Sequence, residues 1–247
     1  MSEDRGEHRL STRLRDLADN IGTRTTGTAE SDDIGRVLPA EHRALLEGLN
    51  GFTVHRGAFR IFGIGRESAL DLGLWNDRET WRFAWPRHLD QFLFFGGTAW
   101  GDQYAYRWGS SGHLAGPEVF FLEANSMGPE PFAESFEQFV VNDLLRNARD
   151  PYDTMTVAAL ASLGAIAPGD HWALAPSVAL GGYEDIANVM TLPSSTAMII
   201  AGDIDSALRG MHPGTRPSAV VPWTDDRGRL RLRLDSAAAQ TRREVDR

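Results

Sequence analysis

The sequence contains neither cysteine nor lysine, and each absence excludes a class of chemistry. Without cysteine there is no disulfide bond, no thiolate nucleophile and no cysteine-bound zinc or iron–sulfur cluster. Without lysine the chain cannot complete the glycine-rich phosphate loop of nucleotide-binding proteins, in which a lysine reaches the phosphates. All 25 basic residues are arginine. The lack of cysteine fits a reducing compartment, and we expect a cytoplasmic location.

Long apolar runs and an excess of positive charge are missing as well. Residues 1–17 (MSEDRGEHRLSTRLRDL) lack the apolar stretch of a signal peptide. Nowhere does the sequence approach the roughly 20 apolar residues of a membrane-spanning helix. The formal net charge is −9, whereas proteins that bind nucleic-acid phosphates present a basic patch. We therefore expect that the protein binds neither a membrane nor a nucleic acid, and that a basic protein is a more suitable partner for its negative charge.

The familiar catalytic and metal-binding motifs do not occur either. The seven histidines are scattered, with no His-Glu-x-x-His motif, and no Gly-x-Ser-x-Gly turn presents a nucleophilic serine. Gly63 and Gly65 begin like a dinucleotide-binding fingerprint, but Ser68 stands where the third glycine belongs. We therefore predict that the protein is not an enzyme, with no catalytic residue, no cofactor and no metal.

Composition and periodicity divide the chain into four segments. Residues 1–35 are polar and predict a flexible arm, with a short helix over residues 8–19. Residues 36–149 predict one α+β domain that begins and ends with a helix. Residues 150–235 predict an α+β extension, and residues 236–247 a frayed tail. In the second segment the helices are expected over residues 37–49 and 131–148, and the strands around residues 52–64, 91–97, 102–108 and 118–124.

The extension is expected to begin with a helix and to end in a β-hairpin. The helix covers residues 155–166, and two short buried runs follow at residues 171–176 and 197–202. A short helix is predicted to start after Asp203, because an aspartate before a helical pattern is a common N-cap. The alternating runs at residues 219–223 and 229–234 flank Asp-Asp-Arg-Gly, which is a strong hairpin signal.

The stretch FFGGTAWGDQYAYRW, Phe94–Trp108, looks most like a functional site. Its three glycines lack the partners of a phosphate cradle, so we interpret them as turn formers, with Asp102 fixing the turn by local hydrogen bonds. Four tryptophans leave two interpretations open: Trp75, Trp81, Trp85 and Trp100. They are more typical of core or interface anchors than of a platform on which a sugar ring stacks.

Two charged patterns in the extension also allow more than one interpretation. Asp203 and Asp205 form an Asp-x-Asp pair of the kind that binds metals in some transferases, but a helix cap explains Asp203 more simply. Asp170 and His171 would join them in the alternative that an enzymatic site lies within residues 151–235. A further pattern predicts either a charged edge strand or a binding site for an acidic ligand: Arg229, Arg231 and Arg233, which alternate with leucines.

Several short motifs, in order, resemble the SUKH superfamily (SMI1/KNR4-like proteins). The resemblance covers about residues 36–147, a little under half of the chain. It starts from LPAEHRALLEGLNG, passes through FRIFG and the Gly-x-x-x-Gly-Asp turn at Gly97–Asp102, and ends in AESFEQF. In the extension, one region weakly resembles type VI immunity proteins that carry a GAD-like domain, and an ordinary turn at Gly181 explains it equally well. The matching residues are Pro176, Leu180, Gly181, Gly182, Glu184 and Asn188.

The resemblance implies a bent antiparallel sheet flanked by helices and a function in protein binding. Many bacterial members are immunity proteins that neutralise a toxin from a neighbouring cell, often a nuclease or a deaminase. It therefore implies that this chain occludes the active site of a cognate and basic toxin. A regulatory or scaffold module is the alternative, and the oligomeric state stays open. The contacts expected on this reading are Trp75, Trp81, Trp100, Asp102, Tyr104 and Tyr106.

Overall fold

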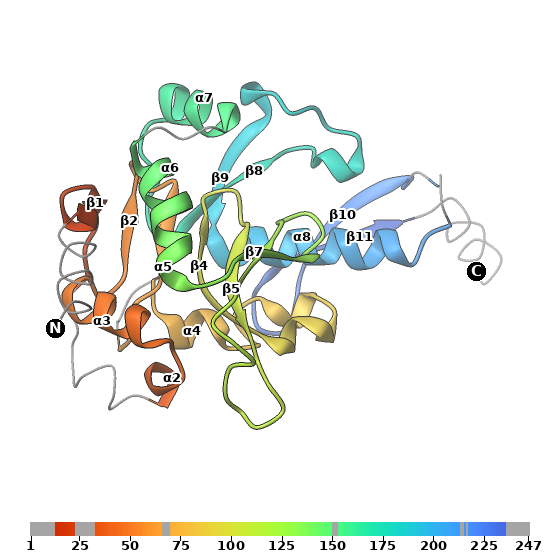
Figure 1. The fold of residues 1–247 in the computed structure, drawn as a ribbon. Coiled ribbons are helices and arrows are strands. Elements are labelled where there is room, and N and C mark those ends of the chain that lie inside the picture. The colour runs from red at the N-terminus through yellow and green to blue at the C-terminus, as the bar shows by residue number, and fades with distance from the viewer. Residues whose placement is uncertain are drawn as a thin grey trace, which may run out of the picture.

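A seven-stranded antiparallel sheet forms the centre of the molecule (Figure 1). The computed structural model describes residues 13–22, 33–65, 70–149, 153–212, 215 and 217–235. The strands lie side by side in chain order, as expected when short connections join neighbours. They are β1 (Ala18–Asp19), β2 (Phe52–Val54), β3 (Phe59–Ile61), β4 (Phe92–Thr98), β5 (Gln103–Arg107), β6 (Val119–Leu122) and β7 (Pro129–Ala133).

Helical segments cover both faces of this sheet, because neighbouring residues of a strand point to opposite faces. On one face, His42 stacks on Phe136 with ring centroids 4.0 Å apart, and Phe95 packs against both rings. On the other face, Phe94 contacts Trp81. The segments are α2 (Asp33–Arg36), α3 (Ala40–Gly48), α4 (Leu72–Asn76), the 3-10 helices η2 (Arg82–Ala84) and η3 (Arg87–Gln91), α5 (Phe136–Phe139), the π-helical turn η4 (Val140–Leu144) and α6 (Leu145–Arg149).

The C-terminal segment builds two hairpins and a long helix beside the sheet. In Figure 1, β8 and β9 lie next to the sheet, while β10 and β11 lie near the C-terminus. Helix α8 packs against η2, β8, β9 and β11 and so links the two hairpins. The elements are α7 (Thr154–Leu163), β8 (Asp170–Leu174), the 3-10 helices η5 (Val178–Leu180) and η6 (Ile186–Asn188), β9 (Val189–Pro193), α8 (Ser194–Arg209), β10 (Ala219–Thr224) and β11 (Leu230–Asp235).

Buried polar groups join the C-terminal segment to the sheet. Arg60, in the centre of β3, is almost completely buried and donates hydrogen bonds to the carbonyl oxygens of Pro168 and Asp170 (both 2.8 Å) and to the hydroxyl of Ser194 (3.2 Å). The indole of Trp85 donates to the carbonyl of Met198 in α8 (2.8 Å). Because a buried donor must find an acceptor, these contacts fix where the segment sits.

Apolar packing continues across the same junction. Leu160, Ile166, Trp172 and Met198 belong to the core cluster that also contains the aromatic residues of the sheet. The backbone follows the same course, since the amide of Trp172 donates to the carbonyl of Ala99 after β4 (2.7 Å). The sheet and the C-terminal segment therefore share one hydrophobic core.

The predicted fold class, an α+β protein with a large antiparallel sheet flanked by helices and a terminal hairpin, is confirmed. Two element predictions in the later part of the chain are wrong. Residues 131–133 lie in strand β7, so the closing helix begins only at Phe136, where Ser135 caps it. The run at residues 197–202 and most of the predicted helix at residues 203–211 belong to a single helix, α8, which ends at Arg209 and in which Asp203 lies well inside and caps nothing.

The polar arm contributes to the sheet where the structure describes it. Leu14 is fully buried in the core, and β1 pairs with β2 through Ala18 opposite Val54. The helix predicted over residues 8–19 therefore does not reach its expected end. Most of the arm and the predicted tail at residues 236–247 lie outside the described residues.

Candidate functional site

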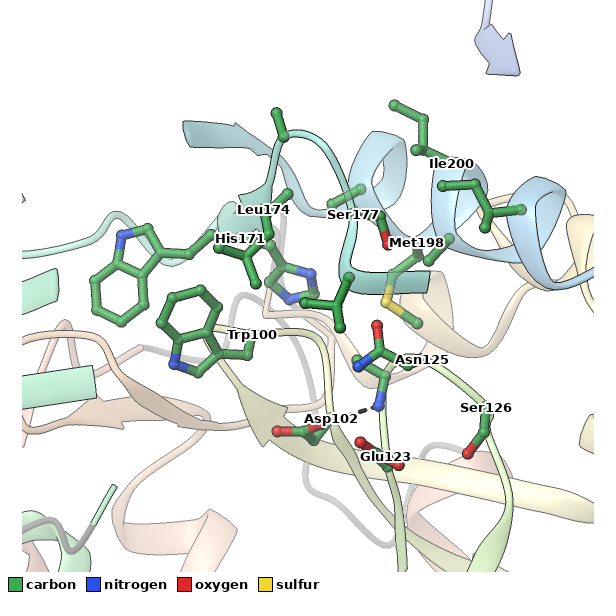
Figure 2. Close-up of a pocket in the computed structure, with 18 of the residues that line it drawn as sticks. Trp100, Asp102, Glu123, Asn125, Ser126, His171, Leu174, Ser177, Met198 and Ile200 are labelled. Carbon is green, nitrogen blue, oxygen red and sulfur yellow. Dashed lines mark hydrogen bonds between the residues drawn. The ribbon is translucent and has the colours of Figure 1, made fainter. Parts of the chain in front are cut away.

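A pocket of about 910 Å³ lies where the sheet meets the C-terminal segment (Figure 2). Five parts of the chain build its walls: the turn between β4 and β5, the β6–β7 loop, the start of α7, β8 with its long connection to β9, and helix α8. The hairpin β10–β11 adds Val220 and Leu232. A pocket of this size, lined by apolar groups with a few polar ones, is typical of a binding site.

The turn at Gly97–Asp102 forms one wall, and its geometry explains its residue types. Gly101 has a φ of +97°, a left-handed conformation that favours glycine. Asp102 accepts a hydrogen bond from the Thr98 hydroxyl (2.7 Å) and another from the backbone N–H of Ala124 (2.9 Å). The aspartate thus ties the turn to the β6–β7 loop. Burial raises the pKa of Asp102, and the two hydrogen bonds oppose that rise.

Trp100 presents a ring to the pocket while its polar edge is already used. Its indole N–H donates to the hydroxyl of Thr156 in α7 (2.9 Å), and its ring lies 5.2 Å from that of Trp172. Thr156 is in turn fixed by Asp153, the N-cap of α7. Figure 2 shows Trp100 beside the other labelled lining residues. The half-buried ring is held in place and contributes an aromatic surface.

His171 lines the pocket with an imidazole that is 1% exposed. Its Nδ1 has no hydrogen-bond partner among the described residues. Gly101 lies close to this nitrogen, since a Cβ atom built on the glycine would be 3.5 Å from it. Burial lowers the pKa of His171 well below its ordinary value, and the positive charge of Arg60 lowers it further. The ring is therefore neutral at physiological pH.

The ionisable lining of the pocket is almost entirely acidic. Five carboxylates line it, and no arginine is among the lining residues. Asp102 and Asp153 hold backbone groups, as described above. Glu123, Glu130 and Glu184 are exposed, and their carboxylates form no ion pair or hydrogen bond within the described part of the chain. The pocket therefore combines apolar walls with negative charge that the described residues do not neutralise.

Exposed apolar side chains border the pocket on the connection between β8 and β9. Tyr183 is 80% exposed, and Val178 and Met190 are also exposed. Glu184 and Asp185 follow Tyr183 directly. Exposed apolar residues surrounded by charge are typical of surfaces that bind proteins. We refer to residues 176–190, which include the first two residues of β9, as the β8–β9 connection.

The structure separates the six residues that the sequence suggested as partner contacts. Trp75, Trp81, Tyr104 and Tyr106 are buried, and so they offer no surface to a partner. The Trp75 indole donates to Gln103 (2.8 Å), and the Tyr104 hydroxyl donates to Asp143 (2.9 Å). Their aromatic character serves the core. Only Trp100 and Asp102 of the six line the pocket.

The four residues of the alternative enzymatic site do not converge. His171 lines the pocket, whereas Asp170, Asp203 and Asp205 do not. Asp203 accepts hydrogen bonds from the guanidinium of Arg231 (2.5 to 3.2 Å) and from the backbone N–H of Leu232 (2.9 Å). Asp205 pairs with Arg209. In the described part of the chain no three potential metal ligands lie together.

The alternating arginines of β11 find their acidic partners within the chain. Besides the pair of Arg231 with Asp203, Arg229 binds Asp225 and Arg233 binds Asp235. Arg229 also lies over the Phe83 ring, 3.7 Å from its centroid. Arg229 and Arg231 therefore anchor the hairpin to η2 and α8, whereas the pair of Arg233 lies within β11.

Sequence reasoning missed most of the pocket. Glu123 and Met190 carried no motif, and the β8–β9 connection attracted notice only through its weak resemblance around Gly181 and Glu184. Gly182 is packed there so that a Cβ atom would come within 1.9 Å of the Pro176 carbonyl oxygen. The glycine pair at residues 181–182 could be noticed in the sequence, but the sequence did not show that this connection lines a pocket.

Comparisons with known proteins show a shared fold. No protein-family model matches the chain, and no curated protein matches it in sequence. The crystal structure of Atu4351 from Agrobacterium tumefaciens is similar, with a TM-score of 0.51 at 15% identity, covering 89% of this chain and 95% of that one. Because the coverage is so high, the similarity extends over the sheet and most of the C-terminal segment. None of the helices in the described residues is long and apolar enough to cross a membrane.

Proposed function

We propose that this chain is a cytoplasmic, SUKH-like immunity protein that binds a basic bacterial toxin and occludes its active site. The observation that carries the proposal is the acid-lined pocket bordered by exposed apolar residues of the β8–β9 connection. An apolar centre with a charged rim is the usual anatomy of a protein interface. The resemblance of residues 36–147 to the superfamily supports the same function.

The proposed contact surface differs from the one that the sequence suggested. Trp100 and Asp102 remain in it, while Tyr183, Val178 and Glu184 replace the four buried aromatic residues. A rigid, exposed tyrosine is a common hot spot, because it contributes a large area at little cost in entropy. The net charge of −9 favours association with a basic toxin such as a nuclease.

Co-expression with the protein encoded beside this gene tests the proposal. If that neighbour is toxic, we expect growth to be restored by this chain and the two proteins to purify as a complex. The double variant Tyr183→Ala with Val178→Ser should lose both effects, while Leu163→Ser, at an exposed apolar position outside the pocket, should keep them. Absence of rescue with both proteins soluble would contradict the proposal. Capture of an endogenous housekeeping partner and no toxin would favour the regulatory alternative.

A further inference from the structure

The pocket carries features that specify what kind of group enters it. Three of its carboxylates have no ion-pair partner among the described residues, its wall includes the ring of Trp100, and Nδ1 of its buried imidazole has no hydrogen-bond partner there. We propose that the pocket receives an arginine side chain, carried on an apolar segment of the partner protein. This inference rests on the proposed function and names the chemistry of the partner.

Charge complementarity is the first argument for arginine. Two carboxylates line the pocket from different segments: Glu123 from the β6–β7 loop and Glu184 from the β8–β9 connection. Glu130 adds a third carboxylate. The nearby Arg209 contacts the Ser126 carbonyl at the edge, but Asp205 pairs with its charge. Among the lining residues no cation competes for these glutamates.

The unsatisfied imidazole is an independent second argument. A buried polar atom without a partner is rare in a folded protein and calls for an explanation. His171 is one of the lining residues, and its buried Nδ1 therefore lies at the wall of the pocket without a hydrogen-bond partner among the described residues. Because the ring is neutral, it does not repel a cation and one of its two nitrogens accepts a hydrogen bond.

The third argument distinguishes arginine from lysine. A guanidinium is planar, stacks on aromatic faces and spreads five N–H donors in a fixed fork, whereas an ammonium is a compact and strongly hydrated charge. Trp100 lines the pocket with its N–H already bonded to Thr156, so it offers an entering group its aromatic ring and no donor. A volume of about 910 Å³ accommodates an arginine side chain together with the apolar residues beside it.

Short peptides test the inference without the toxin. The probe is an acetylated and amidated peptide with one arginine between leucines, compared with peptides in which citrulline, lysine or glutamate replaces the arginine. Citrulline keeps the shape and removes the charge. Binding is read from the indole N–H signals in ¹H–¹⁵N spectra, because two of the seven tryptophans, Trp100 and Trp172, line the pocket. Trp81 and Trp108 do not line it and serve as internal references.

We expect the arginine peptide to shift the Trp100 and Trp172 signals and to bind at least threefold tighter than the citrulline or lysine peptide. The double variant Glu123→Gln with Glu184→Gln should weaken its binding by a factor of about 3 to 10. The matched control, Glu134→Gln with Glu137→Gln, removes two exposed carboxylates elsewhere and should leave binding unchanged. Both double variants should keep the wild-type spectrum in the absence of peptide, since these glutamates are exposed.

Equal binding of the arginine and citrulline peptides would overturn the inference, as would no shift at about 10 mM peptide, a concentration that detects even weak contacts. The two proposals fail separately. Rescue from the toxin without peptide binding would contradict the arginine-binding pocket and would still support the immunity function. Peptide binding without rescue leaves an arginine-binding pocket and removes the immunity function.

Discussion

In the seven-stranded sheet, neighbours in sequence are neighbours in space, and strand pairing and aromatic packing hold them together. The described part of the C-terminal segment forms two small hairpins, whose strands do not pair with that sheet, and the two α-helices α7 and α8. It reaches the sheet through a shared core and a few buried polar contacts, chiefly those of Arg60 and Trp85. The first arrangement depends on many weak contacts, and the second concentrates its specificity in a few side chains.

This difference explains where the pocket lies. Paired strands leave little room between them. The C-terminal segment, in contrast, contacts the sheet at separate places, and a gap remains between these contacts. The pocket occupies that gap, lined by the Gly97–Asp102 turn on one side and by α8 and the β8–β9 connection on the other. Sites built from loops on a rigid scaffold are a common arrangement for binding.

Removing Arg60 should break this junction with the largest effect. In Arg60→Ala the three acceptors on Pro168, Asp170 and Ser194 lose their buried donor, and we expect a loss of about 3–5 kcal/mol in the free energy of unfolding. Urea unfolding measures it. Arg107→Ala, at an exposed position of β5, is the control and should change stability by less than about 0.5 kcal/mol. Similar losses in both variants would show that the junction does not depend on Arg60.

Acid should lower the stability of both the sheet and the C-terminal segment, because each contains one buried histidine. Burial lowers the pKa of His42 to about 3 and that of His171 well below its ordinary value. The unfolded chain takes up protons on these rings near pH 6.5, but the folded chain does not until the pH is far lower. Below pH 6.5 stability should therefore fall by about 1.4 kcal/mol per pH unit for each ring, down to about pH 3 for His42.

Urea unfolding between pH 7.5 and pH 4.5 measures these slopes. His42→Phe and His171→Phe should each flatten the dependence on pH by the contribution of one ring, whatever their stability at neutral pH. His113→Asn, at an exposed position, is the control. A wild-type slope retained in both phenylalanine variants would show that other groups govern the acid response.

Gly202→Ala should give the smallest effect and report on how closely α8 packs. A Cβ atom there would lie 2.8 Å from the Trp85 indole nitrogen and 2.9 Å from the Ala84 carbonyl oxygen. Alanine favours a helix by about 1 kcal/mol over glycine, but this overlap should outweigh the gain and leave a net loss of about 1–2 kcal/mol. Thermal unfolding compares it with Gly210→Ala, where the nearest atom is 3.5 Å away. Stabilisation by Gly202→Ala would show that α8 moves freely on η2.

The sequence predicted the sheet better than it predicted α8. Strands β4 and β5 show dense aromatic and apolar runs ended by glycine or a polar turn, and few other structures accommodate such a pattern. Residues 197–202 are six apolar or small residues, which suit a buried strand and a helix equally. Asp203 then looked like a cap, because its actual partner, Arg231, lies 28 residues away along the chain.

The candidate site was predictable only in part, for the same reason. Trp100 and Asp102 were identified from the Gly97–Asp102 turn, whose glycine needs a positive φ and whose aspartate needs local donors. Whether an aromatic residue faces the core or a partner depends on which element covers it, and the alternation of residues in β5 does not show that. Tyr104 and Tyr106 were therefore suggested as contacts, although helices cover them.

By itself the sequence determined the α+β class, the positions of most strands and the acidic balance, because periodicity, turn residues and charge act over short distances along the chain. The absence of cysteine and lysine likewise excluded thiolate and phosphate-loop chemistry without any structure. The tertiary structure alone decided that Arg60 joins β3 to β8, that Asp203 binds Arg231, and that His171 and Glu184 line one pocket with Trp100. Each of these depends on contacts between residues far apart in sequence, which local preferences do not encode.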